Sequence, residues 1–182
     1  MASEMTLVRR IGLSAQALSQ GLDRAASLVA ATALAVLVGT VILQVVARYL
    51  FQSPPSWTEE LARYSMIWAG LIGATMSFKR RFDPSLFRGA TGSTGMALLA
   101  GTIQSLVVLV YLLPILWHSF YGPGANFARG FLTRHSRTTA DALDFSTLWV
   151  AIAVPIMIVV ILIHLLARWA GDPPPGAQED TG

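Results

Sequence analysis

The chain has 182 residues, of which 54% are hydrophobic and only 13% charged, and its mean hydropathy is +0.58. This composition is typical of an integral membrane protein. The formal net charge is +3, but the basic residues cluster at the ends of apolar segments, which favours a topology signal over binding to nucleic acid. Because the chain has no cysteine, a disulfide, a thiolate metal site and a cysteine nucleophile are all excluded.

The first 27 residues differ from a secretory signal peptide, because Arg9 and Arg10 are followed by a mixed segment without an apolar stretch and cleavage site. Apolar residues at helical spacing form one stripe through this segment: Leu7, Ile11, Leu18 and Leu22. We therefore predict that residues 1–27 form an amphipathic helix on the cytoplasmic membrane surface. An unstructured tail is the alternative.

Residues 28–50 are predicted to form the first transmembrane helix, because a helix rising ~1.5 Å per residue crosses the bilayer core within about 20 apolar residues. Ala31, Ala35 and Gly39 lie four residues apart and form a smooth stripe that suits close contact between helices. We expect this stripe to pack within the chain, and contact with another chain is the alternative.

A Pro-Pro corner follows, since Pro54 and Pro55 prevent the first helix from continuing. The sequence from Ser56 to Glu59 matches a capping box, in which the serine hydroxyl and the glutamate carboxylate satisfy backbone donors at a helix start. A second transmembrane helix is therefore predicted at residues 57–78.

Residues on one face of this second helix recur at three- and four-residue spacing: Trp57, Glu60 or Leu61, Tyr64 and Trp68. Glu59 and Arg63 are an i, i+4 pair, and Glu60 lies within reach of Arg48 across the turn. A helix cap with its ion-pair partner is the simplest explanation of Glu59 and Arg63. However, inserting an ionised side chain at membrane depth costs roughly 2.5–3.5 kcal/mol of free energy. Because unshielded charges are therefore unfavourable there, we predict that Glu60, Arg63 and Arg48 form a shielded polar cluster.

The cluster Lys79-Arg80-Arg81 predicts that the loop after the second helix is cytoplasmic, as are both termini, and that the Pro-Pro corner lies on the opposite side. A third span is predicted at residues 96–117. The aromatic belt beyond it contains Trp117, His118 and Tyr121, in which we interpret His118 as an interfacial residue and not as a ligand.

The long polar connection at residues 122–144 carries the basic residues Arg129 and Arg134, and its last part, Thr138–Asp144, is predicted to be helical already. A fourth span is predicted at residues 145–168. Residues 28–169 would then form one all-α, four-helix membrane domain, and the Pro-rich residues 170–182 a disordered tail.

The sequence lacks the motifs of common catalytic sites. It contains no GxSxG, Walker A, GxGxxG or HExxH pattern, and its three histidines are scattered, so we predict no metal and no cofactor. Glu59 and Glu60 are adjacent and point ~100° apart on a helix, which prevents them from acting together as an acid/base pair. The chain is predicted to be a partner subunit and not an enzyme.

Several strings of residues resemble one family of membrane proteins. They are Arg48-Tyr49-x-Phe51, Trp57-x-Glu59-Glu60-Leu61-Ala62-Arg63-Tyr64, Trp68 and Gly73-Ala74. Together they are similar to the small four-helix membrane subunit, the Q-type subunit, of tripartite ATP-independent periplasmic (TRAP) transporters. The resemblance covers roughly residues 20–170.

This resemblance implies a subunit of a sodium-coupled importer of an organic acid in the bacterial inner membrane. A periplasmic binding protein would deliver the carboxylate to a large membrane subunit, against which the small subunit packs as a scaffold amid membrane lipid. The residues then expected at a subunit interface or in a structural role are Arg48, Trp57, Glu59, Glu60, Arg63, Tyr64 and Trp68. Arg129 and Arg134 are the candidate contacts with the binding protein. The alternative is an autonomous four-helix channel or assembly factor, with the polar corner lining a pore.

Overall fold

A computed structural model describes residues 2–80 and 94–171, with side chains placed at residues 12–80 and 99–171. The predicted all-helical class is confirmed, since the described secondary structure consists of helices and two isolated β-bridges. Within this part, three segments are long and apolar enough to cross a membrane: Gly12–Leu50, Leu99–Phe120 and Leu148–Trp169. The predicted span at residues 57–78 is not among them, so a fourth crossing and the cytoplasmic location of the termini remain predictions.

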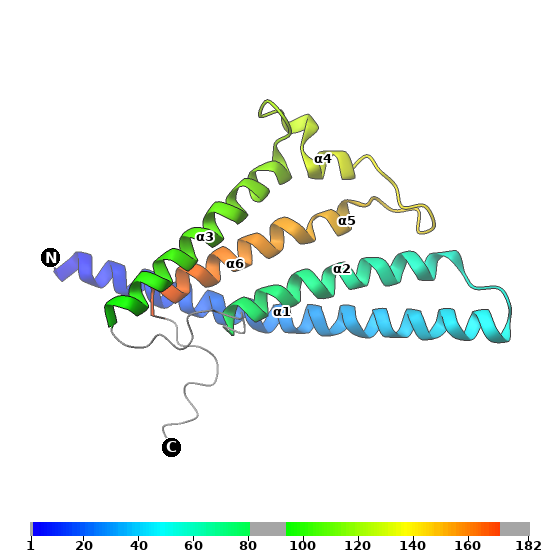
Figure 1. Ribbon diagram of the computed structural model, residues 1–182, viewed down its shortest axis with the longest axis horizontal. Helices are drawn as coiled ribbons and strands as arrows, with labels where there is room; N and C mark the ends of the chain where they lie inside the picture. The colour runs from blue at the N-terminus through cyan, green and yellow to red at the C-terminus, as the bar shows by residue number, and fades with distance from the viewer. Residues whose placement is uncertain (1, 81–93, 172–182) are drawn as a thin grey trace, which may run out of the picture.

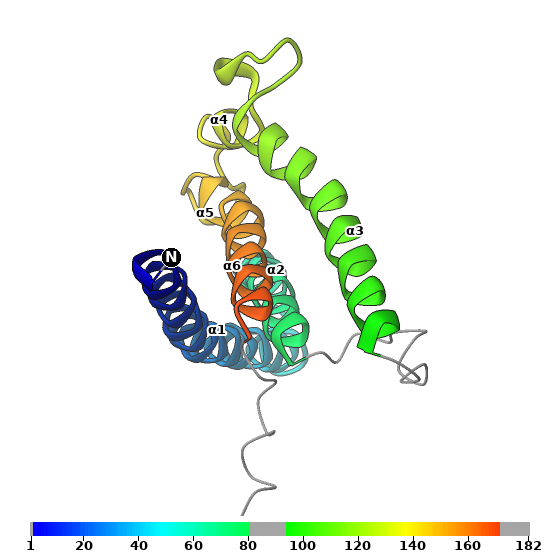
Figure 2. The same ribbon diagram turned by 90° about the vertical axis from the view of Figure 1, so that its left-hand side faces the viewer.

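Helix α1 runs from Ala2 to Leu50 without interruption and curves along its length (Figures 1 and 2). The expected boundary between residues 27 and 28 is therefore not a break in the helix, because no proline or strong capping sequence occurs there. In the predicted amphipathic stripe, Leu7 and Ile11 lie outside the residues whose side chains are described. Leu18 is 53% exposed whereas Ser19 is fully buried, so the polar side of this segment also packs.

The α1–α2 corner forms where the sequence predicts it, but its cap is different. Gln52 adopts a left-handed φ of 52°, and α2 (Ser56–Lys79) begins after Pro55, whose extended backbone makes it the N-cap. The predicted capping box is wrong, because proline has no side-chain acceptor and Ser56 lies one position inside the helix. Thr58 instead donates its hydroxyl to the Pro55 carbonyl at 2.7 Å.

The helices of this hairpin run side by side and pack through small residues (Figure 1). The predicted stripe is not the packed one: Ala31, Ala35 and Gly39 are exposed, and a Cβ added to Gly39 would have no neighbour within 4 Å. The buried or half-buried residues of α1 recur at alternating four- and three-residue steps: Ala26, Ala30, Ala33, Leu37, Thr40, Gln44 and Ala47. Every residue of this heptad-like seam except Leu37 and Gln44 has a short side chain, which lets α2 approach closely.

Helix α6 (Ala153–Trp169) packs against α1, α2 and α3 (Thr94–Phe120). The buried apolar cluster between these helices consists of Phe78, Leu112, Ile158, Ile161 and Leu165. The short helix α5 (Leu148–Ala151) precedes α6, and Ile152 separates the two. Pro155 accounts for this break, because it has no N–H to donate to the carbonyl of Ala151.

Polar side chains join the helices at the end of the bundle where α2 and α6 finish. Ser19 Oγ and His164 Nδ1 lie 2.9 Å apart and are both buried. Lys79 donates to the Ser19 carbonyl at 3.0 Å, and Arg168 donates to the Phe78 carbonyl at 3.0 Å with its guanidinium over the Phe78 ring. These contacts connect α1, α2 and α6, and the sequence did not indicate the role of His164.

The connection between α3 and α5 is folded and contains the 3-10 helix η1 (Phe127–Arg129) and α4 (Phe131–His135). The predicted helix at Thr138–Asp144 is wrong. Thr139 and Ser146 form an antiparallel bridge, Ala140 donates to the Phe145 carbonyl at 2.8 Å, and Asp144 has a φ of 53°. These residues therefore form a tight turn, and the left-handed backbone of Asp144 prevents a helix from running on into residue 145.

Candidate functional site

The carboxylate of Glu60 joins the start of α2 to the connection that precedes α5. Its Oε2 accepts a hydrogen bond from the Ala142 N–H at 2.8 Å, and its Oε1 accepts one from the Asp141 N–H at 3.2 Å. Oε1 also accepts the Tyr64 hydroxyl proton at 2.6 Å. These two amides lie in a turn, where no helix satisfies them, so Glu60 supplies the acceptors that the turn lacks.

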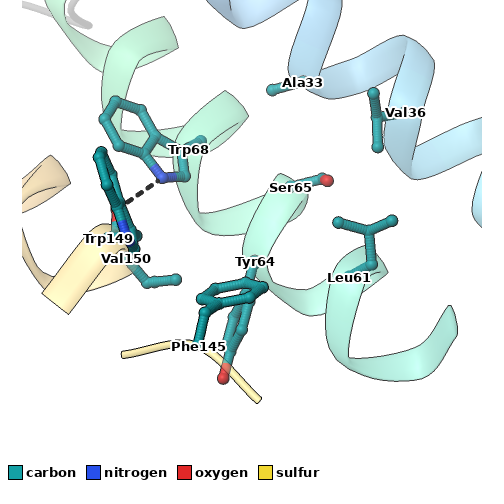
Figure 3. A pocket seen from close by; sticks show the side chains of 9 residues that line it. All are labelled: Ala33, Val36, Leu61, Tyr64, Ser65, Trp68, Phe145, Trp149 and Val150. Atoms are coloured by element: carbon teal, nitrogen blue, oxygen red, sulfur yellow. Dashed lines mark hydrogen bonds between the residues drawn. The ribbon is translucent and has the colours of Figure 1, made fainter. Parts of the chain in front are cut away.

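Tyr64 and Trp68 continue the same face of α2 toward α5, as Figure 3 shows. The ring of Tyr64 packs against Phe145 with centroids 6.0 Å apart. Trp68 Nε1 donates to the Trp149 carbonyl at 3.1 Å. Glu60, Tyr64 and Trp68, at four-residue spacing, therefore hold residues 141–149 against α2. We call these contacts the α2 latch.

The pKa of Glu60 lies below its ordinary value of 4.5, mainly because the Tyr64 hydroxyl and then the loop amides stabilise the carboxylate. Burial and the hydrogen bond to Glu60 raise the pKa of Tyr64 to about 12. Both residues lie outside the three segments that are apolar enough to span a membrane. At neutral pH the site therefore contains an ionised acceptor and a protonated donor.

A pH titration should detect the α2 latch. Because folding lowers the pKa of Glu60 below 4.5, the stabilisation is complete above that pH and is lost as the pH falls through the lowered value. We expect the amide resonance of Ala142, observed by NMR in nanodiscs, to change only below pH 4.5 and to stop titrating in Glu60→Gln. A transition centred above pH 4.5 would contradict the assignment.

The neighbouring carboxylate has a different partner. Glu59 Oε1 accepts a hydrogen bond from Arg63 at 2.9 Å, and the two side chains are 69% and 60% exposed, which confirms the predicted i, i+4 pair. The predicted cluster of Glu60, Arg63 and Arg48 is wrong: Arg48 is exposed at the end of α1, and no ion pair joins it to Glu60 in the described residues. Trp57, on the face of α2 that carries Glu60 and Tyr64, is 38% exposed.

Replacement of Arg63 by alanine should barely affect the isolated chain. An exposed i, i+4 ion pair contributes about 0.3–0.5 kcal/mol to stability. We therefore expect Arg63→Ala to lower the Tm in detergent by less than a conservative core substitution does. Leu165→Val, at a buried core position, is the comparison. If Arg63→Ala lowered the Tm as much as Leu165→Val does, the assignment of Glu59 and Arg63 as an exposed ion pair would be incorrect.

The basic residues Arg129 and Arg134 are exposed in the connection between α3 and α5, near Phe127, which is 60% exposed. The backbone beneath them is closely packed. A Cβ on Gly122 would lie 2.6 Å from the carbonyl carbon of Arg129, and a Cβ on Gly130 would lie 2.7 Å from that of Phe120. The connection thus presents its charges on a defined platform.

No grouping of three or more potential metal ligands occurs among the residues described in the structure. The site residues instead make structural contacts between segments far apart in the chain. Of the predicted face, Glu60, Tyr64 and Trp68 make contacts on the α5 side. Glu59 and Arg63, which that face did not include, form an exposed pair. Asp141, Ala142 and Phe145 complete the contact, and sequence reasoning missed them because Asp141 and Ala142 contribute main-chain amides and Phe145 contributes a ring.

A family model described as tripartite ATP-independent periplasmic transporters, DctQ component, matches residues 37–172. No curated protein and no solved structure gives a significant match. The matched range contains most of the chain, including the α2 latch and all of α6. The DctQ component is a membrane subunit of a transporter, so its family is a transporter family and not an enzyme family. The chain therefore belongs to the DctQ family, the small membrane component of TRAP transporters.

Proposed function

We propose that the chain is the non-catalytic scaffold of a sodium-coupled TRAP transporter that imports a carboxylate across the bacterial inner membrane. A large membrane subunit would carry the substrate and sodium, and a periplasmic binding protein would deliver the substrate. In this proposal the small subunit enlarges the rigid body against which the transport domain of the large subunit moves.

The distribution of charge in the three apolar segments carries this proposal. No Asp, Glu, Lys or Arg occurs between Arg24 and Arg48 in α1, within Leu99–Phe120, or between Leu148 and Arg168. A pathway for sodium and a carboxylate requires charged groups or unwound backbone at membrane depth. These helices carry no charged side chain between those limits, and the break at Ile152 keeps right-handed helical backbone angles (φ −67°, ψ −18°) and is not an unwound segment, which favours a supporting role.

The polar contacts lie at the two ends of the bundle and suit a rigid body. The α2 latch holds one end, and the Ser19–His164 and Arg168–Phe78 contacts hold the other. The alternative of a pore lined by the polar corner has less support, because both oxygens of Glu60 already accept hydrogen bonds from the protein.

Reconstitution tests the scaffold. We expect the chain alone and the large subunit alone to be inactive in proteoliposomes, and the complex to take up a carboxylate when binding protein and a sodium gradient are both supplied. Uptake or ion conductance by the chain alone would contradict the scaffold and support an autonomous channel.

We propose further that Arg129 and Arg134 contact the binding protein, because they are exposed on a platform outside the apolar segments. Charges at the edge of an interface mainly affect association and its dependence on salt. We expect the double variant Arg129→Glu/Arg134→Glu to raise the concentration of binding protein that gives half-maximal uptake. Arg80→Glu, a single charge reversal at the exposed C-cap of α2, is the control. An equal effect of both variants would argue against docking at this loop.

A further inference from the structure

An apolar groove of about 220 Å³ lies between the α1–α2 hairpin and the segment that leads into α5 (Figure 3). It is lined by Ala33, Val36, Leu61, Tyr64, Ser65, Trp68, Phe145, Trp149 and Val150. The α2 latch therefore bridges the two walls of this groove without filling the space between them.

Carbon atoms dominate the surface that the groove offers to an occupant. The polar atoms of its two largest α2 side chains have partners elsewhere, since Trp68 Nε1 donates to the Trp149 carbonyl and the Tyr64 hydroxyl donates to Glu60. Apolar cavities of ~150 Å³ in other proteins stay free of water and take up apolar molecules. The groove likewise offers water few polar partners, so an apolar occupant is favoured over water.

The position of the groove determines which apolar molecule is available. Ala33 and Val36 lie in the uncharged run of α1 between Arg24 and Arg48, within a segment long and apolar enough to cross the membrane. The groove is open, and nearby residues of α1 in sequence, such as Val29 and Leu34, have exposed apolar side chains. The α1 wall of the groove therefore faces hydrocarbon.

The volume of the groove distinguishes between two apolar candidates, a helix of another subunit and a lipid hydrocarbon chain. A helix of another subunit, about 10 Å in diameter, is too wide to enter a groove of this volume. A flexible hydrocarbon chain can enter and adapt to an irregular wall, and it restores the dispersion contacts that an unfilled groove would lack.

We propose that this groove binds one acyl chain of a membrane lipid, which packs between α1, Trp68 and Trp149. The lipid chain completes the contact between the hairpin and the start of α5 beside the α2 latch. This site is additional to the proposed scaffold role, and its test does not depend on transport.

Quenching of Trp68 fluorescence by lipids brominated along the acyl chain tests the proposal. The full chain, with its other four tryptophans replaced by phenylalanine, is placed in nanodiscs of brominated or ordinary phosphatidylcholine. Ala33→Phe fills the groove from α1, and Val110→Phe, at a position 66% exposed on α3, is the matched control. Circular dichroism and size-exclusion elution verify that all variants keep their helices and remain monodisperse.

We expect brominated lipid to quench Trp68, Ala33→Phe to reduce the quenching at least about twofold, and Val110→Phe to leave it unchanged. Quenching that groove filling does not alter, or no quenching at all, would overturn the proposal. The measurement is repeated in the complex with the large subunit, after subtraction of the signal from a Trp68→Phe complex. Quenching that disappears in the complex would identify a side chain of the large subunit as the occupant and would also overturn the lipid assignment.

Discussion

Glu60→Ala should reduce uptake by the reconstituted transporter about tenfold or more, because two loop amides and the Tyr64 hydroxyl lose their common acceptor. Without it, the turn around Ala142 has no partner on α2, and the segment leading into α5 is no longer held. We expect the large subunit to co-purify less efficiently with this variant, since the rigid surface on which it would pack is altered.

The adjacent carboxylate provides a matched control. Glu59→Ala makes the same chemical change one residue away, but it removes only an exposed ion pair with Arg63. Glu60→Gln keeps the shape and one acceptor oxygen, so we expect an intermediate effect. Equal uptake by Glu59→Ala and Glu60→Ala, measured at the same amount of assembled complex, would show that the contacts of Glu60 are unimportant.

Gly130→Ala should destabilise the connection between α3 and α5. The added Cβ would clash with the Phe120 carbonyl, lying 2.7 Å from its carbon, and would lie 3.2 Å from the Phe127 carbonyl oxygen. Both neighbours are main-chain atoms, which cannot rotate away as a side chain does. Overpacking of this kind costs about 1–3 kcal/mol, so we expect a lower Tm and faster proteolysis between α3 and α5.

Gly73→Ala is the control for this substitution. A Cβ at Gly73 has no neighbour within 4 Å, and alanine is favoured over glycine in a helix interior such as that of α2. We expect this variant to match or slightly exceed the stability of the native chain. If Gly130→Ala were as stable as Gly73→Ala, the close approach of residue 130 to the end of α3 would be incorrect.

The helices were predictable because local sequence determines them. Long apolar runs and the positions of Pro54 and Pro55 place both ends of α2 and α3, and the C-terminal end of α1, within a few residues of their ends in the structure. The Glu59–Arg63 pair was equally local. The capping box failed for a local reason too, since the backbone of Pro55 moved the cap by one position.

The packing of these helices was harder to predict. In a water-soluble protein the buried face of a helix is the apolar one, but in a membrane protein the lipid-facing side is apolar as well. Apolar periodicity therefore could not separate the exposed stripe of Ala31, Ala35 and Gly39 from the packed seam through Ala33 and Thr40. Small residues occur in both, and only the neighbouring helix distinguishes them.

The amino-acid sequence by itself determined the membrane class, the helices, the family and the absence of cysteine chemistry, because composition and short motifs carry that information. The tertiary structure alone decided the partners of the polar side chains. Glu60 contacts amides 81 and 82 residues away, and Ser19 contacts His164 across 145 residues. Such contacts depend on how helices and turns are arranged in space, and no local pattern of residues encodes that arrangement.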